Sequence, residues 1–185
     1  MRPTPTSNPK SPRLKVINLW AGPGAGKSTT AAALFAAMKA KGLRVELVRE
    51  FAKELTYEAD FMRLGNQLLI LAEQHRRLDA LVGQVDYAIT DSPLPIGIAY
   101  ARPAWRTSAF IGVVKEAWSH FDNLNYWVER VKPYQTYGRN ETEAEARKLD
   151  DRLMAVASEF CRRIVRVKGD ERAGQLILGH LGVTQ

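Results

Sequence analysis

Hydrophobic residues along the chain form short apolar runs that alternate with longer segments of helical periodicity. The apolar runs predict strands at 14–20, 44–48, 85–90, 124–128 and 164–167. The helical pattern predicts an Ala-rich helix from Ser28 to about Lys41, a long helix from Phe61 to about Val82, and a closing helix through Leu176 and Leu178. Strands alternating with helices in this way predict an α/β fold, in which helices cover both faces of a five-stranded parallel sheet.

The long helical segment has one continuous apolar face. The residues expected on it are Leu64, Leu68, Leu71, His75, Leu78 and either Leu81 or Val82. Gly42, directly after the first predicted helix, is the residue type favoured at a helix C-terminus.

Residues 1–13 contain four of the nine prolines and almost no apolar side chains, so they predict a flexible tail before one domain at 14–185. The apolar content of 45% excludes gross disorder. The single cysteine, Cys161, excludes an internal disulfide framework and agrees with a reducing compartment. No apolar run approaches the roughly 18 residues of a membrane span, and no signal peptide is evident, so we expect a soluble, cytoplasmic protein.

The strongest motif lies between the first predicted strand and helix, where residues 21–29 read AGPGAGKST. This is a Walker A phosphate loop with alanine at its usual first glycine position. Glycines in such a loop let successive N–H groups point at phosphate oxygens, and the following helix directs its positive end at the same anion. The candidate nucleotide-binding residues are Gly22, Gly24, Ala25, Gly26, Lys27, Ser28 and Thr29. Lys27 would reach the β- and γ-phosphates, and the Ser28 hydroxyl would bind Mg²⁺.

Two carboxylates follow predicted strands and are expected at the same edge of the sheet. Asp91 ends the third strand, where it would hold Mg²⁺ through water or orient an acceptor hydroxyl. Glu50 follows the second strand and is suited to accept a proton from an acceptor. Arg49 beside it would hold an anion or lower the pKa of Glu50.

A loop rich in basic residues follows the fourth strand. Arg130, Lys132 and Arg139 flank its Pro and Gly residues, and a helix is expected to begin with Asn140 as N-cap and Glu143 three residues later. Arginines on a mobile loop over a phosphate site neutralise transition-state charge and exclude water. The segment at about 130–142 is therefore the candidate lid.

Together the phosphate loop, Arg49-Glu50, Thr90-Asp91-Ser92-Pro93 and the lid resemble small phage-type P-loop kinases. These are similar to nicotinamide riboside kinase domains and to nucleoside or nucleotide kinases, and the resemblance runs from about Leu14 to Gly182. It implies the strand order 2-3-1-4-5, a lid carrying Arg130 and Arg139, and ATP with Mg²⁺ as cofactors. Glu50 and Asp91 would share acceptor activation and metal binding, in an order that stays open.

Within that group the chain most resembles phage DNA kinases that phosphorylate 5-hydroxymethyluracil in DNA during thymidine hypermodification, which would act in the host cytoplasm. The net charge of +7 fits a DNA substrate but equally fits a requirement for solubility. Arg102 and Arg106 would bind backbone phosphates, and Trp105 would either stack on a base or pack as an ordinary aromatic.

Three other functions stay open. One is a kinase for a free nucleoside, a nucleotide or nicotinamide riboside. Another is a nucleic-acid-binding protein that uses ATP as a switch without phosphotransfer. The last is a GTPase or motor, which the sequence disfavours because Leu94 follows Asp91-Ser92-Pro93 where a GTPase switch needs glycine.

Overall fold

The computed structural model describes residues 13–131 and 142–182, and every structural statement below concerns these residues. Residues 1–12 of the predicted tail and most of the predicted lid, including Lys132, Arg139 and Asn140, lie outside them. Five parallel strands form one sheet in the order β2-β3-β1-β4-β5, which confirms the predicted fold class and strand order. The strands are β1 (Lys15–Trp20), β2 (Val45–Val48), β3 (Tyr87–Thr90), β4 (Asp122–Glu129) and β5 (Val165–Lys168).

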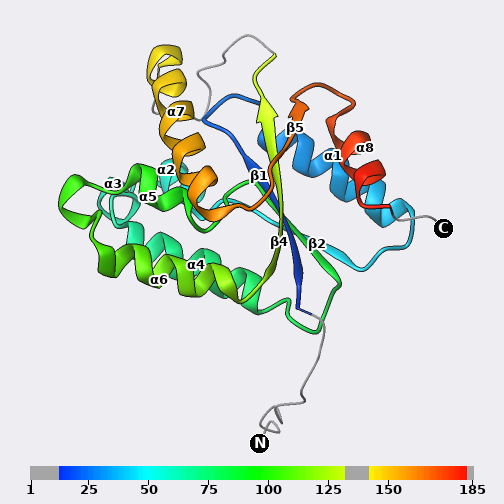
Figure 1. Ribbon diagram of the computed structural model, residues 1–185, viewed down its shortest axis with the longest axis horizontal. Coiled ribbons are helices and arrows are strands. Elements are labelled where there is room, and N and C mark those ends of the chain that lie inside the picture. Colours follow the sequence, from blue (N-terminus) through cyan, green and yellow to red (C-terminus); the bar gives the residue numbers. More distant parts are fainter. Residues whose placement is uncertain (1–12, 132–141, 183–185) are drawn as a thin grey trace, which may run out of the picture.

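Helices cover both faces of this sheet (Figure 1). One face carries α1 (Lys27–Ala40) and α8 (Ala173–His180), and the other carries α4 (Gln67–Asp79), α6 (Ser108–Ser119) and α7 (Glu143–Phe160). The shorter helices are α2 (Phe51–Tyr57), α3 (Phe61–Leu64), α5 (Ile96–Tyr100) and the 3₁₀ turn η1 (Pro103–Trp105). None of the helices in the described ranges is long and apolar enough to cross a lipid bilayer.

The central strand β1 is buried on both faces because its side chains alternate between two cores. Val16 and Trp20 pack into the core shared with α4, α6 and α7. Ile17 and Leu19 point the other way, into the core beneath α1 and α8. Each of these four side chains is fully buried, as expected for the middle strand of a parallel sheet.

The long helix predicted over 61–82 is two helices, α3 and α4, separated at Gly65 and Asn66. The break has a local cause, because the Asn66 side chain accepts a hydrogen bond from the backbone N–H of Leu69 and so caps a new helix. The restart changes the buried face. Leu68, predicted to be on the apolar face, is 44% exposed.

Two further helix predictions need correction. The helix after the lid begins at Glu143, with Thr142 and Glu145 forming the capping box in place of Asn140 and Glu143. Both pairs have the required three-residue spacing, so the sequence alone did not separate them. Helix α6 was not predicted, although Thr107 caps it and its buried residues recur at Phe110, Val114 and Trp118.

Candidate functional site

Four parts of the predicted site lie where strands end, along the carboxyl edge of the sheet. The phosphate loop at residues 21–26 leaves β1, Glu50 leaves β2, Asp91 leaves β3 and Arg130 leaves β4. In an open parallel sheet this edge is where ligands bind. The fold therefore brings together residues that are far apart in sequence.

The loop turns directly into helix α1. Gly26 is the N-cap of α1 and has a φ of 99°, a left-handed conformation that glycine adopts without strain. A Cβ at Gly26 would also lie 3.1 Å from the carbonyl oxygen of Gly169, which follows β5. The first amide groups of α1, from Lys27, Ser28 and Thr29, have no intrahelical acceptor, as at every helix N-terminus, and are suited to bind an anion.

Lys27 is held against the beginning of the loop. Its ammonium donates to the carbonyl oxygens of Ala21 at 2.7 Å and Gly22 at 3.0 Å. An ammonium has three donors, so one is available for a phosphate oxygen. Burial lowers the pKa of Lys27, while the nearby carboxylates of Glu50 and Asp91 act in the opposite direction.

Ser28 and Asp91 form a pair that fits Mg²⁺. The Ser28 hydroxyl donates to Oδ2 of Asp91 at 2.5 Å. Asp91 is only 6% exposed, and its other oxygen, Oδ1, is buried without a hydrogen-bond partner among the described residues. A buried carboxylate oxygen without a partner is unfavourable unless a cation or water satisfies it. One hydroxyl and one carboxylate, completed by phosphate oxygens and waters, are typical Mg²⁺ ligands.

Arg130, directly after β4, contacts both the phosphate loop and α7. It forms an ion pair with Asp150 at 2.9 Å and donates to the carbonyl oxygen of Pro23, and its side chain is 8% exposed. The other oxygen of Asp150 accepts the backbone N–H of Gly22 at 2.6 Å. A Cβ at Gly22 would collide with Asp150, so this glycine is required for space and not for a positive φ. Arg130 thus supports the loop in this structure.

One cavity of about 520 Å³ extends from the phosphate loop to helices α2, α3 and α5. At one end it is lined by Gly24, Gly26, Lys27 and Ser28, and Glu50 and Ser92 also line it. The far end is lined by aromatic and polar side chains, namely Lys53, Thr56, Tyr57, Phe61, Gln67, Tyr100 and Arg102. This size and composition are typical of a site for a small organic ligand.

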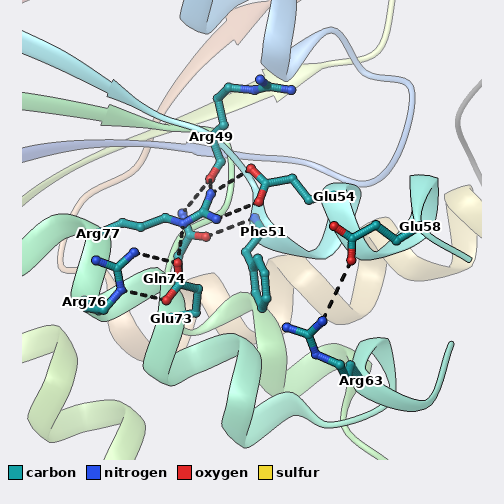
Figure 2. A network of polar contacts seen from close by, with 9 residues as sticks. All are labelled: Arg49, Phe51, Glu54, Glu58, Arg63, Glu73, Gln74, Arg76 and Arg77. Carbon is teal, nitrogen blue, oxygen red and sulfur yellow. Dashed lines mark hydrogen bonds and ion pairs between the residues drawn. The ribbon is translucent and has the colours of Figure 1, made fainter. Parts of the chain in front are cut away.

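The buried side chain of Gln74 holds both peptide groups that flank Glu50 (Figure 2). Its Oε1 accepts the N–H of Phe51 at 3.2 Å, and its Nε2 donates to the carbonyl oxygen of Arg49 at 3.4 Å. Nε2 also donates to the hydroxyl of Thr90 at 3.2 Å, directly before Asp91. A single amide therefore links the backbone next to Glu50 with the end of β3.

Salt bridges between α2 and α4 reinforce this link. Arg77 binds both carboxylate oxygens of Glu54, at 2.9 Å and 2.7 Å, and also binds Glu73 at 2.9 Å (Figure 2). Hydrogen bonds from Arg76 and Arg77 lower the pKa of Glu73 to about 2, and the hydrogen bond from Arg77 lowers the pKa of Glu54. The Arg77 guanidinium also stacks on Phe51, 5.1 Å from the ring centroid.

The predicted acceptor-binding residues separate into two groups. Arg102 lines the cavity and Trp105 lies beside it, exposed to 55%. Arg106 instead donates to the carbonyl oxygens of Ala101 and Ala99, at 2.8 Å and 3.2 Å. Figure 2 shows the guanidinium of Arg49 directed away from the network around Gln74.

Sequence reasoning missed Asp150, Gln74 and, apart from Arg102, the residues at the far end of the cavity. Asp150 lies 128 residues from the loop amide that it binds, and Gln74 lies 23 residues from Phe51. No local motif marks either residue. Gln74 lies on the same buried face of α4 as Ile70, Leu71 and Leu78. A polar residue within this apolar face was the one signal in the sequence that marked Gln74.

The sheet order, the glycine loop at the N-terminus of α1 and the Ser28–Asp91 pair together define a P-loop NTPase fold with a nucleotide-binding loop. Residues 16–173 match the sequence family AAA_28, described as "AAA domain", and the chain therefore belongs to this family. No curated protein matches the sequence. A crystal structure of thymidylate kinase from Ehrlichia chaffeensis is similar over 93% of this chain and 100% of that chain, with a TM-score of 0.58 and 14% sequence identity. At that identity the similarity extends to the fold alone.

Proposed function

We propose that this protein is a kinase that transfers the γ-phosphoryl group of ATP to a hydroxyl group of a nucleoside-like acceptor. One observation carries the proposal: the phosphate loop and a second set of aromatic and polar residues line the same cavity, with Glu50 on its wall. A protein that only hydrolyses or senses ATP has no need of a second binding region beside the γ-phosphate. A kinase requires both substrates in one water-excluding site.

The triphosphate would bind along the loop. The first amides of α1 and the third donor of Lys27 supply the contacts to its oxygens. Ser28 and the buried Oδ1 of Asp91 would hold Mg²⁺. The bound ion neutralises charge on the phosphates when it is present.

We assign different roles to the two carboxylates because their surroundings differ. Glu50 lines the cavity and is suited to accept the acceptor's proton, because it faces the region where the hydroxyl must lie. Asp91 is buried and already engaged by Ser28, so we assign it to the metal. Arg130 would act by fixing the loop. Charge neutralisation by Arg139 and substrate binding by Lys132 stay predictions for the lid.

The acceptor that the sequence resemblance favours is 5-hydroxymethyluracil within phage DNA. Its hydroxymethyl group is a primary alcohol, and the aromatic residues Tyr57, Phe61 and Tyr100 on the cavity wall are suited to hold a pyrimidine ring. A free nucleoside, a nucleotide or nicotinamide riboside would use the same ring contacts. The acceptor is therefore the part of the proposal that needs direct measurement.

An acceptor screen with γ-labelled ATP and Mg²⁺ tests the proposal. The acceptors are thymidine, 5-hydroxymethyl-2′-deoxyuridine, thymidine monophosphate, nicotinamide riboside, and plain or 5-hydroxymethyluracil-containing DNA. We expect label on at least one acceptor and none with Lys27→Ala. DNA binding that changes with ATP while every acceptor stays unlabelled would instead indicate an ATP-switched binding protein.

Two conservative variants separate the roles of the carboxylates. Glu50→Gln should lower kcat with little change in the Mg²⁺ concentration needed for half-maximal rate. Asp91→Asn should raise that Mg²⁺ concentration, because the neutral amide is a weaker ligand for a hard cation. If Asp91→Asn leaves the Mg²⁺ dependence unchanged, the metal assignment is wrong.

A further inference from the structure

A second cavity of about 310 Å³ adjoins the first, on the side away from the phosphate loop. The two cavities share Gly65, Gln67 and Arg102 as lining residues. The second is otherwise lined by Met62, Asn66, Leu68, Ala101, Trp105 and Phe110. Its position makes it an extension of the acceptor end of the site.

The lining of the second cavity selects for a flat, uncharged group. Trp105 is 55% exposed and Met62 is 86% exposed, although a large apolar surface is normally buried. Trp20, Trp118 and Trp127 are buried, so Trp105 is the exceptional tryptophan. Exposed aromatic faces next to an acceptor site are suited to stacking on a nucleobase.

Arg102 lies at the junction of the two cavities. Among the described residues that line the second cavity it alone carries a charge, and its guanidinium has no hydrogen bond or ion pair with any described residue. Its Nη2 lies 3.3 Å from the position that a Cβ on Gly65 would occupy, which places the guanidinium close to the shared wall. A positive group at the junction of two cavities fits an anionic link between the groups that the cavities bind.

We propose that the second cavity binds the nucleotide next to the acceptor nucleotide in single-stranded DNA, with the intervening phosphodiester at Arg102 and the neighbouring base on Trp105. This inference rests on the proposed kinase function. The neighbouring base uses its face for Trp105 and cannot at the same time stack within a duplex, so the substrate is single-stranded or locally opened.

Acceptors of increasing length test this inference kinetically. The series is 5-hydroxymethyl-2′-deoxyuridine, its 3′- and 5′-monophosphates, and the dinucleotides with one thymidine on either side. Stacking of one base implies that KM for the better dinucleotide is lower than KM for the nucleoside by between about 5- and 150-fold. We expect Trp105→Ala to remove most of the decrease in KM that the second base produces. We expect Arg102→Gln to remove the decrease in KM that the phosphate produces.

Val113→Ala is the matched control. Val113 is an apolar side chain on α6 with 51% exposure, and it lines neither cavity, so the variant should keep the wild-type KM for every acceptor. Equal KM values for the nucleoside and both dinucleotides in the wild-type protein would overturn the inference.

Fluorescence gives a second measurement that does not depend on phosphotransfer. Because Trp105 is the one exposed tryptophan of the four, acrylamide quenches mainly its emission. The dinucleotide should protect this emission from acrylamide and the nucleoside should not. Failure of all acceptors to become phosphorylated would refute the kinase proposal, whereas transfer without any protection of Trp105 would refute the second-cavity site alone.

Discussion

Replacing Gln74 by leucine tests how the position of Glu50 is fixed. The substitution keeps the approximate volume of a side chain that is 2% exposed and removes its three hydrogen bonds. Two of the partners keep another hydrogen bond. The carbonyl oxygen of Arg49 still accepts from Arg77, and the Thr90 hydroxyl still bonds with the backbone of Ser92. The N–H of Phe51 loses the acceptor that the side chain supplied.

The expected loss of stability follows from this difference. A buried donor left without a partner costs about 1–3 kcal/mol, and each bond whose partner is otherwise satisfied contributes roughly 0.5 kcal/mol. The sum is about 2–4 kcal/mol, which is less than the 5–15 kcal/mol typical of a whole domain. The variant should therefore fold, with Tm lowered by roughly 5–15 °C for a chain of this length.

The effect on catalysis should exceed what the loss of stability explains. Gln74 holds the peptide groups on both sides of Glu50. Without these hydrogen bonds the backbone no longer fixes the position of Glu50, the proposed base. A misplacement of 1 Å at a reacting group costs about 100-fold in rate, and we expect kcat to fall by between 10- and 100-fold. KM for ATP should stay close to wild type, because no bond of Gln74 reaches the phosphate loop.

The assay combines thermal unfolding with acceptor-dependent ADP release below the Tm of the variant. Gln175→Leu is the matched control, since it is the same substitution at an exposed position of α8 and should change stability by less than about 0.5 kcal/mol. A wild-type kcat in folded Gln74→Leu would refute the positioning role. An unchanged Tm would show that the three hydrogen bonds contribute no net stability.

Three other predictions concern different parts of the molecule. Asp150→Ala should lower the free energy of unfolding by about 3 kcal/mol, because it leaves the buried Arg130 guanidinium without its carboxylate; a chemical-denaturation midpoint equal to wild type would contradict this. Burial lowers the pKa of His75, which bonds to His120 at 3.1 Å, so the unfolded chain binds a proton more readily than the folded protein. The stability present above about pH 6.5 should therefore decline as the pH falls towards the folded-state pKa. Tm measured from pH 7.5 to 5.5 should fall more for wild type than for His75→Gln. Burial raises the pKa of Cys161 to about 12, so iodoacetamide at pH 7.5 should alkylate this thiol slowly in the folded protein and quickly in guanidinium chloride, and equal rates would contradict its burial.

Local patterns predicted the sheet and the phosphate loop because both depend on short segments. β1 is a short, mainly apolar segment whose apolar residues are interrupted by Asn18, and the loop is a contiguous motif whose geometry depends on Gly26 and the N-terminus of α1. The helical boundaries were less accurate. The cap at Asn66 depends on one side-chain hydrogen bond, and the cap at Thr142 depends on the two reciprocal hydrogen bonds of its capping box. Periodicity does not register either.

The supporting residues of the site were not predictable in the same way. Asp150 and Gln74 act through bonds to backbone groups that lie far away in the sequence. Arg130 follows a strand and precedes a basic segment, which is the pattern of a lid arginine, and no local pattern indicates its ion pair with Asp150. Such contacts follow from the packing of α4 and α7 on the sheet, and packing is a property of the whole fold.

The ratio of products formed from ATP tests the central claim most directly. ADP and phosphorylated acceptor would be quantified in the same reaction with γ-labelled ATP, Mg²⁺ and 5-hydroxymethyluracil-containing single-stranded DNA. The kinase proposal predicts one phosphorylated acceptor for each ADP, and neither product above background with Lys27→Ala. ADP accompanied by an equal amount of inorganic phosphate, with no label on DNA or on any nucleoside supplied in its place, would contradict it.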